Sequence, residues 1–175
     1  MALRVVTLSA ALATAGAVCP SPQWLLYRDQ CYWASPFPLE WRSVASVCEL
    51  QAPGSRHVSV HDLQVAAFVA EQVLNGTGGW LGLRRPNESA GWQWSDGTPY
   101  DWHDWAAGQP RGDGERCAYL QRGGTDGWRD GDCIVSYLRF VCQTEDQLVT
   151  TTEPPETTQP YSTTAQATEN SVTVS

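Results

Sequence analysis

The chain has 175 residues, of which 42% are hydrophobic, and this length and composition allow one domain with a hydrophobic core plus tails. Its formal net charge is −8, and its 11 basic residues are all arginines. This balance provides no basic stripe along which phosphates would bind, so we expect no nucleic-acid partner.

The first 17 residues have the pattern of a secretory signal peptide. One arginine precedes an apolar run that is too short to span a bilayer, and the run ends in small residues up to Ala17. We expect cleavage after Ala17 and a secreted, extracellular protein; a buried core helix is the alternative, but nothing caps the run as a helix would need. In that compartment the six cysteines, none of them in a Cys-x-x-Cys pair, are expected to form three disulfides.

The predicted elements begin with a short hairpin over residues 19–31, which leads into a strand at 32–33. Residues 38–50 have apolar side chains at three-and-four spacing and a proline near the start, which predicts an amphipathic helix. A second helix is predicted from residue 61 or 62 to Leu74, where an Asn-Gly pair ends it. Two helices therefore precede the remaining elements.

Beyond the second helix, short apolar or alternating runs lie between clusters of turn-forming residues, as in the strands of an antiparallel sheet. Two helices followed by such strands predict an α+β fold class. The predicted strands are residues 80–83, 92–94, 116–120 and 136–142.

Residues 108–133 hold the densest cluster of charged and turn-forming side chains in the chain. Because glycine and proline are interleaved with the charges, we expect this stretch to be largely loop, with side chains that face water or a ligand. Trp128 lies within it. Four other tryptophans are expected in the core or its walls, with indole N–H groups bonded to loop carbonyls: Trp41, Trp80, Trp94 and Trp105.

From residue 144 onward the composition changes to a Thr- and Pro-rich tail with ten threonines. Such a segment buries too little surface to offset its ordering entropy, so we predict a disordered, mucin-like stalk over residues 144–175. The sequence has no membrane span after it, so we expect either a secreted protein with this tail or a soluble form of a membrane-anchored protein. Asn75 and Asn87 begin sequons in predicted turns and are expected N-glycosylation sites.

Five short motifs, together with the order of the six cysteines, point to a known family. The motifs are Trp-Leu-Gly-Leu at 80–83, Trp-Ser-Asp-Gly at 94–97, Gly-Gln-Pro at 108–110, Trp-Arg-Asp at 128–130 and Phe-Val-Cys at 140–142. On these residues the predicted domain, 18–143, resembles a C-type lectin-like domain of the long form, which has an N-terminal hairpin disulfide. The resemblance implies the C-type lectin-like fold and the disulfides Cys19–Cys31, Cys48–Cys142 and Cys117–Cys133.

In sugar-binding members of this family, a calcium ion is held by a Glu-Pro-Asn or Gln-Pro-Asp triplet, a following glutamate and a Trp-Asn-Asp run. The matching positions here are Gln109-Pro110-Arg111, Glu115 and Trp128-Arg129-Asp130. Calcium takes about six to eight oxygen ligands, but a guanidinium has only donors and cannot coordinate a cation.

The resemblance therefore implies that only Gln109, Glu115 and Asp130 keep ligand oxygens if calcium binds at all. We expect no metal and no other cofactor. Our hypothesis is that Arg111 and Arg129 replace the ion and bridge Glu115 and Asp130 by charge-assisted hydrogen bonds.

The expected function is extracellular recognition of a protein or glycan ligand, without calcium, through this loop. A loop that only folds on itself is the plainer alternative, and a calcium-dependent lectin with galactose-like preference is the alternative that the Gln-Pro pair suggests. Arg111-Gly112-Asp113 suggests a third function, an integrin-type adhesion ligand. The expected ligand-binding residues are Gln109, Arg111, Glu115, Trp128, Arg129 and Asp130.

An enzymatic function is not expected. Asp101, His103 and Asp104 bring acid and imidazole groups together, but no nucleophile or metal-ligand set accompanies them. His57 and His61 lie near the predicted start of the second helix and are expected to cap it or to be solvated.

Overall fold

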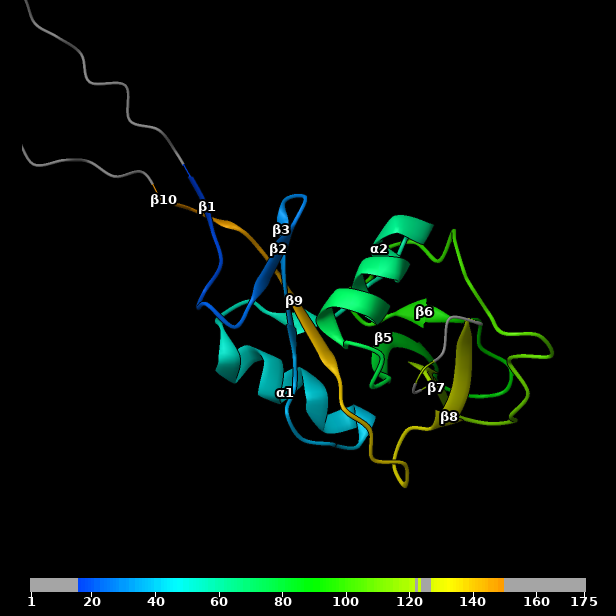
Figure 1. The fold of residues 1–175 in the computed structure, drawn as a ribbon. Helices are drawn as coiled ribbons and strands as arrows, with labels where there is room; N and C mark the ends of the chain where they lie inside the picture. The colour runs from blue at the N-terminus through cyan, green and yellow to red at the C-terminus, as the bar shows by residue number, and fades with distance from the viewer. Residues whose placement is uncertain (1–15, 122, 124–126, 150–175) are drawn as a thin grey trace, which may run out of the picture. The chain divides into compact units, whose positions relative to one another are not determined.

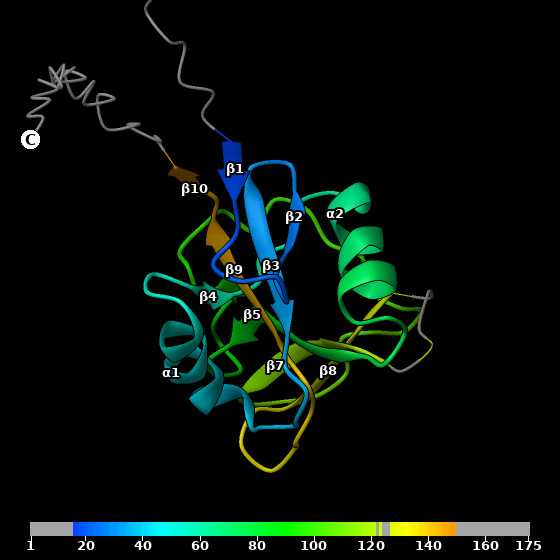
Figure 2. The same cartoon turned by 60° about the vertical axis from the view of Figure 1, so that its left-hand side comes forward.

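Three antiparallel sheets and two helices make up the computed structural model, which describes residues 16–121, 123 and 127–149 (Figure 1). The ends of this part lie side by side, because β1 (Gly16–Val18) pairs with β10 (Gln147–Val149) (Figure 2). The paired strands therefore include Ala17, after which we predict cleavage, and extend past residue 143, where we predicted the domain to end. Residues 1–15 and 150–175, which hold most of the predicted signal peptide and tail, lie outside the described residues.

The first four-stranded sheet joins the hairpin near the N-terminus to two strands from later in the chain. Its strand order is β2-β3-β9-β4, with all neighbours antiparallel. A hairpin forms over residues 25–34, later in the chain than predicted, and the predicted strand at 32–33 is part of its second strand. In Figure 2 this sheet lies between α1 and α2. The strands are β2 (Leu25–Tyr27), β3 (Gln30–Ala34), β4 (Arg56–His57) and β9 (Val141–Glu145).

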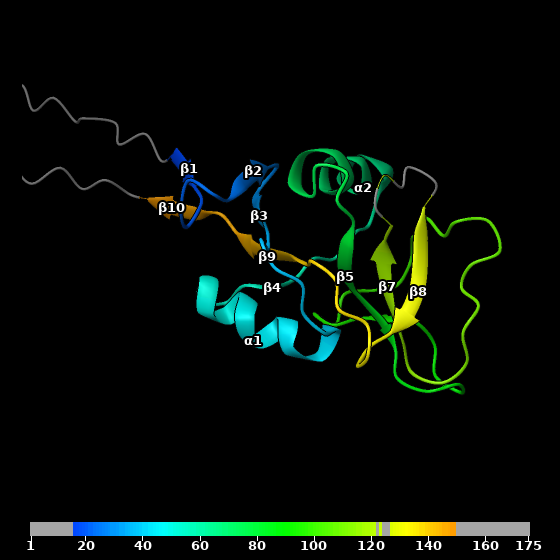
Figure 3. The same cartoon turned by 60° about the horizontal axis from the view of Figure 1, so that its bottom comes forward.

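The second four-stranded sheet has the order β6-β5-β7-β8 and carries the long loop (Figure 3). Three of its strands match predicted runs, whereas β8 lies in the stretch that we predicted as loop. Along β8 the side chains of Trp128 and Asp130 are buried and that of Arg129 is half-buried, the alternation of a strand. The strands are β5 (Gly79–Arg85), β6 (Gln93–Trp94), β7 (Arg116–Leu120) and β8 (Trp128–Asp132).

Both predicted helices form, with shorter bounds. Helix α1 (Trp41–Gln51) buries Trp41, Val44 and Cys48 of the predicted apolar face, whereas Ala45, which the same spacing placed on that face, is exposed. Helix α2 (Leu63–Phe68) begins after Asp62, whose carboxylate accepts a hydrogen bond from the Val65 N–H at 2.8 Å and so caps the first turn. The chain then continues as a π-helical turn, η1 (Val69–Val73). Among the described residues, no helix is long and apolar enough to cross a membrane.

The three disulfides implied by the family resemblance are present: Cys19–Cys31, Cys48–Cys142 and Cys117–Cys133. The second of these joins α1 to β9 across 94 residues of sequence. The third closes the stretch that contains β8, because it joins β7 to the residue after β8. The segment from β7 to the end of β8 is thus closed covalently.

Hydrogen bonds from two indole N–H groups join α1 and the segment just before it to the second sheet. The Trp41 N–H donates to the Leu81 carbonyl at 2.7 Å, and the Trp80 N–H donates to the Leu39 carbonyl at 2.9 Å. These core positions are confirmed, as is that of buried Trp94. The predicted bonds to loop carbonyls are not general, because Trp41 donates to a strand carbonyl and the buried Trp94 N–H has no partner among the described residues. The Trp105 N–H donates to the Tyr100 hydroxyl at 2.7 Å.

His57 is a core residue, so the expectation that it caps a helix or is solvated is wrong. It lies on β4, is 1% exposed, and stacks on the Trp41 ring at a centroid distance of 4.4 Å. Its Nε2 lies 3.2 Å from the Trp41 carbonyl oxygen, which makes Nε2 the protonated nitrogen of the neutral ring. His61 is exposed, and its Nδ1 lies 3.5 Å from the Asp101 carboxylate.

Candidate functional site

A long irregular loop lies beside β8 (Figure 3). Residues 95–115 connect β6 to β7 with no helix or strand of their own apart from an isolated bridge between Trp105 and Trp128. Two backbone hydrogen bonds fasten the loop to β8: the Ala106 N–H donates to the Trp128 carbonyl at 2.9 Å, and the Trp128 N–H donates to the Asp104 carbonyl at 2.5 Å. The sheet therefore holds the loop by its backbone.

Trp128 lies beneath the loop in a cluster of indole rings. Its side chain is 0% exposed, and three other tryptophan rings lie 5.4 to 5.8 Å from it between centroids. The prediction that Trp128 contacts a ligand is therefore wrong, because its whole ring is buried against these tryptophans and helps to position the loop. The partner rings are those of Trp94, Trp102 and Trp105.

Asp130 is the centre of the polar network that holds the loop. Its side chain is 1% exposed. Oδ1 accepts a hydrogen bond from the Arg111 N–H at 2.7 Å, and Oδ2 accepts from the Gly112 N–H at 2.9 Å and from Arg116 Nε at 2.6 Å. One carboxylate thus joins β8, the loop and β7, and both of its oxygens are engaged.

The surroundings of Asp130 favour its charged form. Burial by itself acts to raise the pKa of this carboxyl, but the hydrogen bonds from the Arg111 N–H, the Arg116 side chain and the Gly112 N–H outweigh it. The pKa of Asp130 therefore lies below its ordinary value, and the carboxylate keeps its charge. Arg116 is the neighbouring cation that balances this charge.

Position 112 leaves little room for a side chain because the network closes around it. A Cβ atom there would lie 2.2 Å from Arg116 Nε and 2.7 Å from Asp130 Oδ2, far inside van der Waals contact. The Arg85 guanidinium on β5 binds the same turn, contacting the Gly112 carbonyl and donating to the Gly114 carbonyl at 3.3 Å. The turn is therefore bound by side chains from β5 and from β8.

Gln109 takes part in the same network through its amide. Its Oε1 accepts a hydrogen bond from the Asp130 N–H at 3.3 Å, and the Gln109–Pro110 peptide bond is cis. Glu115 points elsewhere: it forms an ion pair with Arg42 on α1, whose Nε donates to Oε1 at 3.3 Å while Nη2 contacts Oε2. The two carboxylates among the predicted ligand residues, those of Asp130 and Glu115, thus belong to two separate ion pairs.

Arginines do neutralise the two carboxylates, but they are not the ones that we predicted. Arg116 pairs with the first carboxylate and Arg42 with the second, so the hypothesis of bridging by Arg111 and Arg129 is wrong. The Arg111 guanidinium is exposed, and its Nε donates to the Gly108 carbonyl at 3.0 Å. Arg129 is half-buried on β8.

We predicted no metal, and the three residues that would hold calcium if it bound do not lie together as a cation site. Gln109 and Asp130 are neighbours, yet each Asp130 oxygen already accepts a hydrogen bond, and both Glu115 oxygens contact Arg42. Across the described ranges, no three His, Cys, Asp or Glu side chains are grouped so as to hold a metal. These residues therefore do not fit a calcium ion in the arrangement that the chain adopts.

Around this network the outer surface of the loop is formed by Pro110, Arg111 and Asp113, all exposed. The Arg-Gly-Asp tripeptide thus presents its two charged side chains outward while the backbone of Gly112 is fixed to Asp130. His103 stacks on the ring of Tyr100 at 6.0 Å. This contact gives His103 a packing role.

The sequence did not predict the roles of Arg42, Arg85 and Arg116. The signal for Arg116 was its place at the start of a predicted strand that pairs with the stretch containing Asp130. No comparable signal marks Arg42, which is 73 residues from Glu115 in the sequence.

Comparisons with known proteins agree with the fold. Residues 38–144 match the family model described as Lectin C-type domain. C-type lectin domain family 10 member A from Homo sapiens is 30% identical over 149 residues, which cover 80% of this chain and 44% of that protein. Asialoglycoprotein receptor 1 from Rattus norvegicus is 33% identical over 138 residues, which cover 73% of this chain and 45% of that protein. The chain thus spans less than half the length of these relatives.

A solved structure matches over nearly the whole folded part. The C-type carbohydrate-recognition domain of cow CD23, crystallised in the presence of a GlcNAc2Man3 oligosaccharide, is 27% identical, with a TM-score of 0.64 over 74% of this chain and 98% of that one. The relatives named above are lectins or receptors, and none belongs to an enzyme family. The match of the family model over more than half of the sequence, together with the fold and the three disulfides, shows that the chain belongs to the C-type lectin domain family.

Proposed function

We propose that this chain is an extracellular recognition module that binds a protein or glycan ligand without calcium through the exposed surface of its long loop. One observation carries the proposal: the buried Asp130 carboxylate is bound by Arg116 and by the backbone N–H groups of Arg111 and Gly112. In this arrangement a cation is not needed to order the loop.

Electrostatics supports calcium independence. A unit positive charge about 5 Å from a divalent ion costs roughly 6 to 7 kcal/mol at an effective dielectric constant near 20. Arg116 lies against the one buried carboxylate of the predicted ligand set, so a calcium ion there would have to displace its guanidinium. The Glu115 carboxylate is held by Arg42 and would have to be released as well.

The rigid support of the loop favours recognition over a purely structural role. The Asp130 network fixes the backbone of the turn, while the side chains of Arg111 and Asp113 remain exposed. A prearranged loop loses less conformational entropy when it binds. Arginine is also among the residue types that carry most binding energy at interfaces. Location outside the cell is supported by the three disulfides, which persist in oxidising compartments.

A glycan array probed in calcium and again in EDTA tests the proposal. We expect every positive glycan to keep its signal in EDTA and to lose it in the Arg111→Ala variant, because the exposed loop and not a metal makes the contact. Signals that vanish in EDTA would instead establish a calcium-dependent lectin, the alternative with galactose-like preference. The Glu88→Gln variant, altered at an exposed turn outside the loop network, serves as the matched control.

A further inference from the structure

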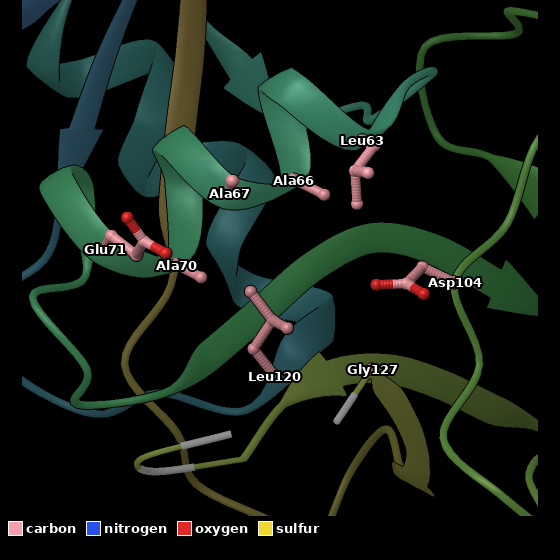
Figure 4. A pocket seen from close by; sticks show the side chains of 8 residues that line it. All are labelled: Leu63, Ala66, Ala67, Ala70, Glu71, Asp104, Leu120 and Gly127. Atoms are coloured by element: carbon pink, nitrogen blue, oxygen red, sulfur yellow. The ribbon is translucent and has the colours of Figure 1, made fainter. Parts of the chain in front are cut away.

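A small groove lies between α2 with η1 on one side and the base of the long loop on the other (Figure 4). Its volume is about 180 Å³. Ligand pockets for drug-sized molecules usually measure about 300 to 1,000 Å³, so this groove suits a single side chain. The lining residues are Leu63, Ala66, Ala67, Ala70, Glu71, Asp104, Leu120 and Gly127.

Small residues leave the groove open. Three alanines, at positions 66, 67 and 70, give the helical wall no bulk, and Leu120 of β7 lies opposite them (Figure 4). At Gly127 a Cβ atom would lie 2.5 Å from the Asp104 carbonyl oxygen and 2.7 Å from the Ala106 nitrogen, so only glycine fits there. Leu63 is 62% exposed at the rim. The surface inside the groove is therefore mainly aliphatic.

The polar lining consists of two carboxylates. In Figure 4 the Asp104 side chain points from the loop into the groove, and Glu71 projects from the helical wall. Within the part of the chain that the structure describes, neither side chain has a hydrogen-bond or ion-pair partner. The groove thus contains two carboxylates that pair with no cation among the described residues.

We infer that this groove binds a basic side chain, a lysine or arginine, of a protein partner. Ionised carboxylates accept hydrogen bonds but cannot donate them, and the remaining lining side chains have no polar atoms. The groove therefore selects a group that carries donors and positive charge and rejects an anion. The methylene stem of lysine or arginine fits the aliphatic wall while its cation pairs with one of the two carboxylates.

Neither a saccharide nor a neutral apolar group fits these features equally well. A saccharide presents hydroxyls that need acceptors and donors around them, whereas the alanine and leucine wall offers none. A neutral apolar group would cover the half-buried Asp104 carboxylate without giving it a hydrogen-bond donor. The groove shares no residue with the exposed Arg111 surface, so it is a second site that does not depend on the function proposed for the loop.

Titration of the isotope-labelled chain with n-pentylammonium, followed by amide NMR shifts, tests the inference. n-Pentanol has the same chain length without the charge and is the matched probe. We expect saturable shifts at the amides of Ala66, Ala70, Leu120 and Gly127, with binding of the ammonium about tenfold or more tighter than of the alcohol. The tenfold factor is the expected contribution of one hydrogen-bonded pair between the ammonium and a carboxylate.

Three variants distinguish binding in the groove from a general attraction of the ammonium to the negative charge of the chain. Asp104→Asn and, on the helix, Glu71→Gln are each expected to weaken ammonium binding several-fold, whereas Glu88→Gln removes one exposed negative charge elsewhere and should leave binding unchanged. Equal binding of the two probes, no saturable shift with either, or an equal effect of all three variants would overturn the inference. Shifts at these amides on concentrating the chain without a probe would also overturn it, because they would identify a second copy as the occupant.

Discussion

Replacing Asp130 with asparagine is expected to destabilise folding by about 3 to 5 kcal/mol, the usual cost of leaving one member of a buried ion pair without its partner. The change removes the charge that Arg116 neutralises and weakens the acceptor that binds the N–H groups of Arg111 and Gly112. An amide also has one acceptor oxygen where the carboxylate has two. For a domain of this size the loss corresponds to a decrease in Tm of about 10 °C.

Denaturant unfolding of the Asp130→Asn variant beside Asp113→Asn measures this effect. Asp113 lies in the same loop but is exposed, so its substitution should change the free energy of unfolding by about 0.5 kcal/mol or less. Equal effects of the two substitutions would show that the Asp130 network does not hold the loop. Arg116→Met in the Asp130→Asn background should add little further loss, because the pair is already broken.

Folding stability is expected to fall by on the order of 3 kcal/mol as the pH decreases from about 6.5 to about 4, because of His57. Burial lowers the pKa of His57 to about 4, opposed by its hydrogen bond to the Trp41 backbone and reinforced by the positive charge of Arg84. The unfolded chain protonates its histidine near pH 6.5, whereas the folded chain resists protonation down to about pH 4. The stability contribution is therefore complete above the unfolded pKa and is lost across this window.

The His57→Phe variant isolates this contribution. Phenylalanine keeps a ring that can stack on Trp41 but has no titratable nitrogen, so its stability should change much less between pH 6.5 and 4.5 than that of the native chain. The comparison uses the slope with pH, since the lost hydrogen bond also changes the absolute stability. His103→Gln, at an exposed histidine, should keep the native slope. A native chain whose stability is flat over this range would contradict the assignment to His57.

Local signals in the sequence predicted much of the fold. The three-and-four spacing of Trp41, Val44 and Cys48 predicted the buried face of α1, and the Asp62 cap marks where α2 begins. The disulfide pairing followed from the family resemblance and not from spacing, since six cysteines permit 15 connectivities.

Strand β8 and the role of Trp128 were not predicted because the local composition points the other way. Charges and glycines surround Trp128, which is typical of a loop, and its burial depends on tryptophans from the long loop that approach it in three dimensions. The partners of Asp130 were missed for the same reason. Arg116 reaches Asp130 only because β7 and β8 pair with Ala118 opposite Asp130, a register that the sequence alone does not specify.

The burial of His57 likewise depends on a long-range contact. β5 passes so close to β4 that a Cβ atom at position 82 would lie 2.8 Å from the Cβ of His57, and Gly82 permits this approach. The ring is then enclosed beside Trp41 of α1. Residues 57 and 82 are far apart in the chain, and neither has a local pattern that indicates the contact.

Thermal unfolding of the native chain in millimolar calcium and in EDTA tests the central claim, that Arg116 and the loop amides replace a cation around Asp130. Because a ligand that binds only the folded state stabilises it by mass action, calcium at about 100 times its Kd would add about 2.7 kcal/mol. The Asp130 network predicts the same Tm in both solutions. A Tm several degrees higher in calcium, reversed by EDTA, would contradict it.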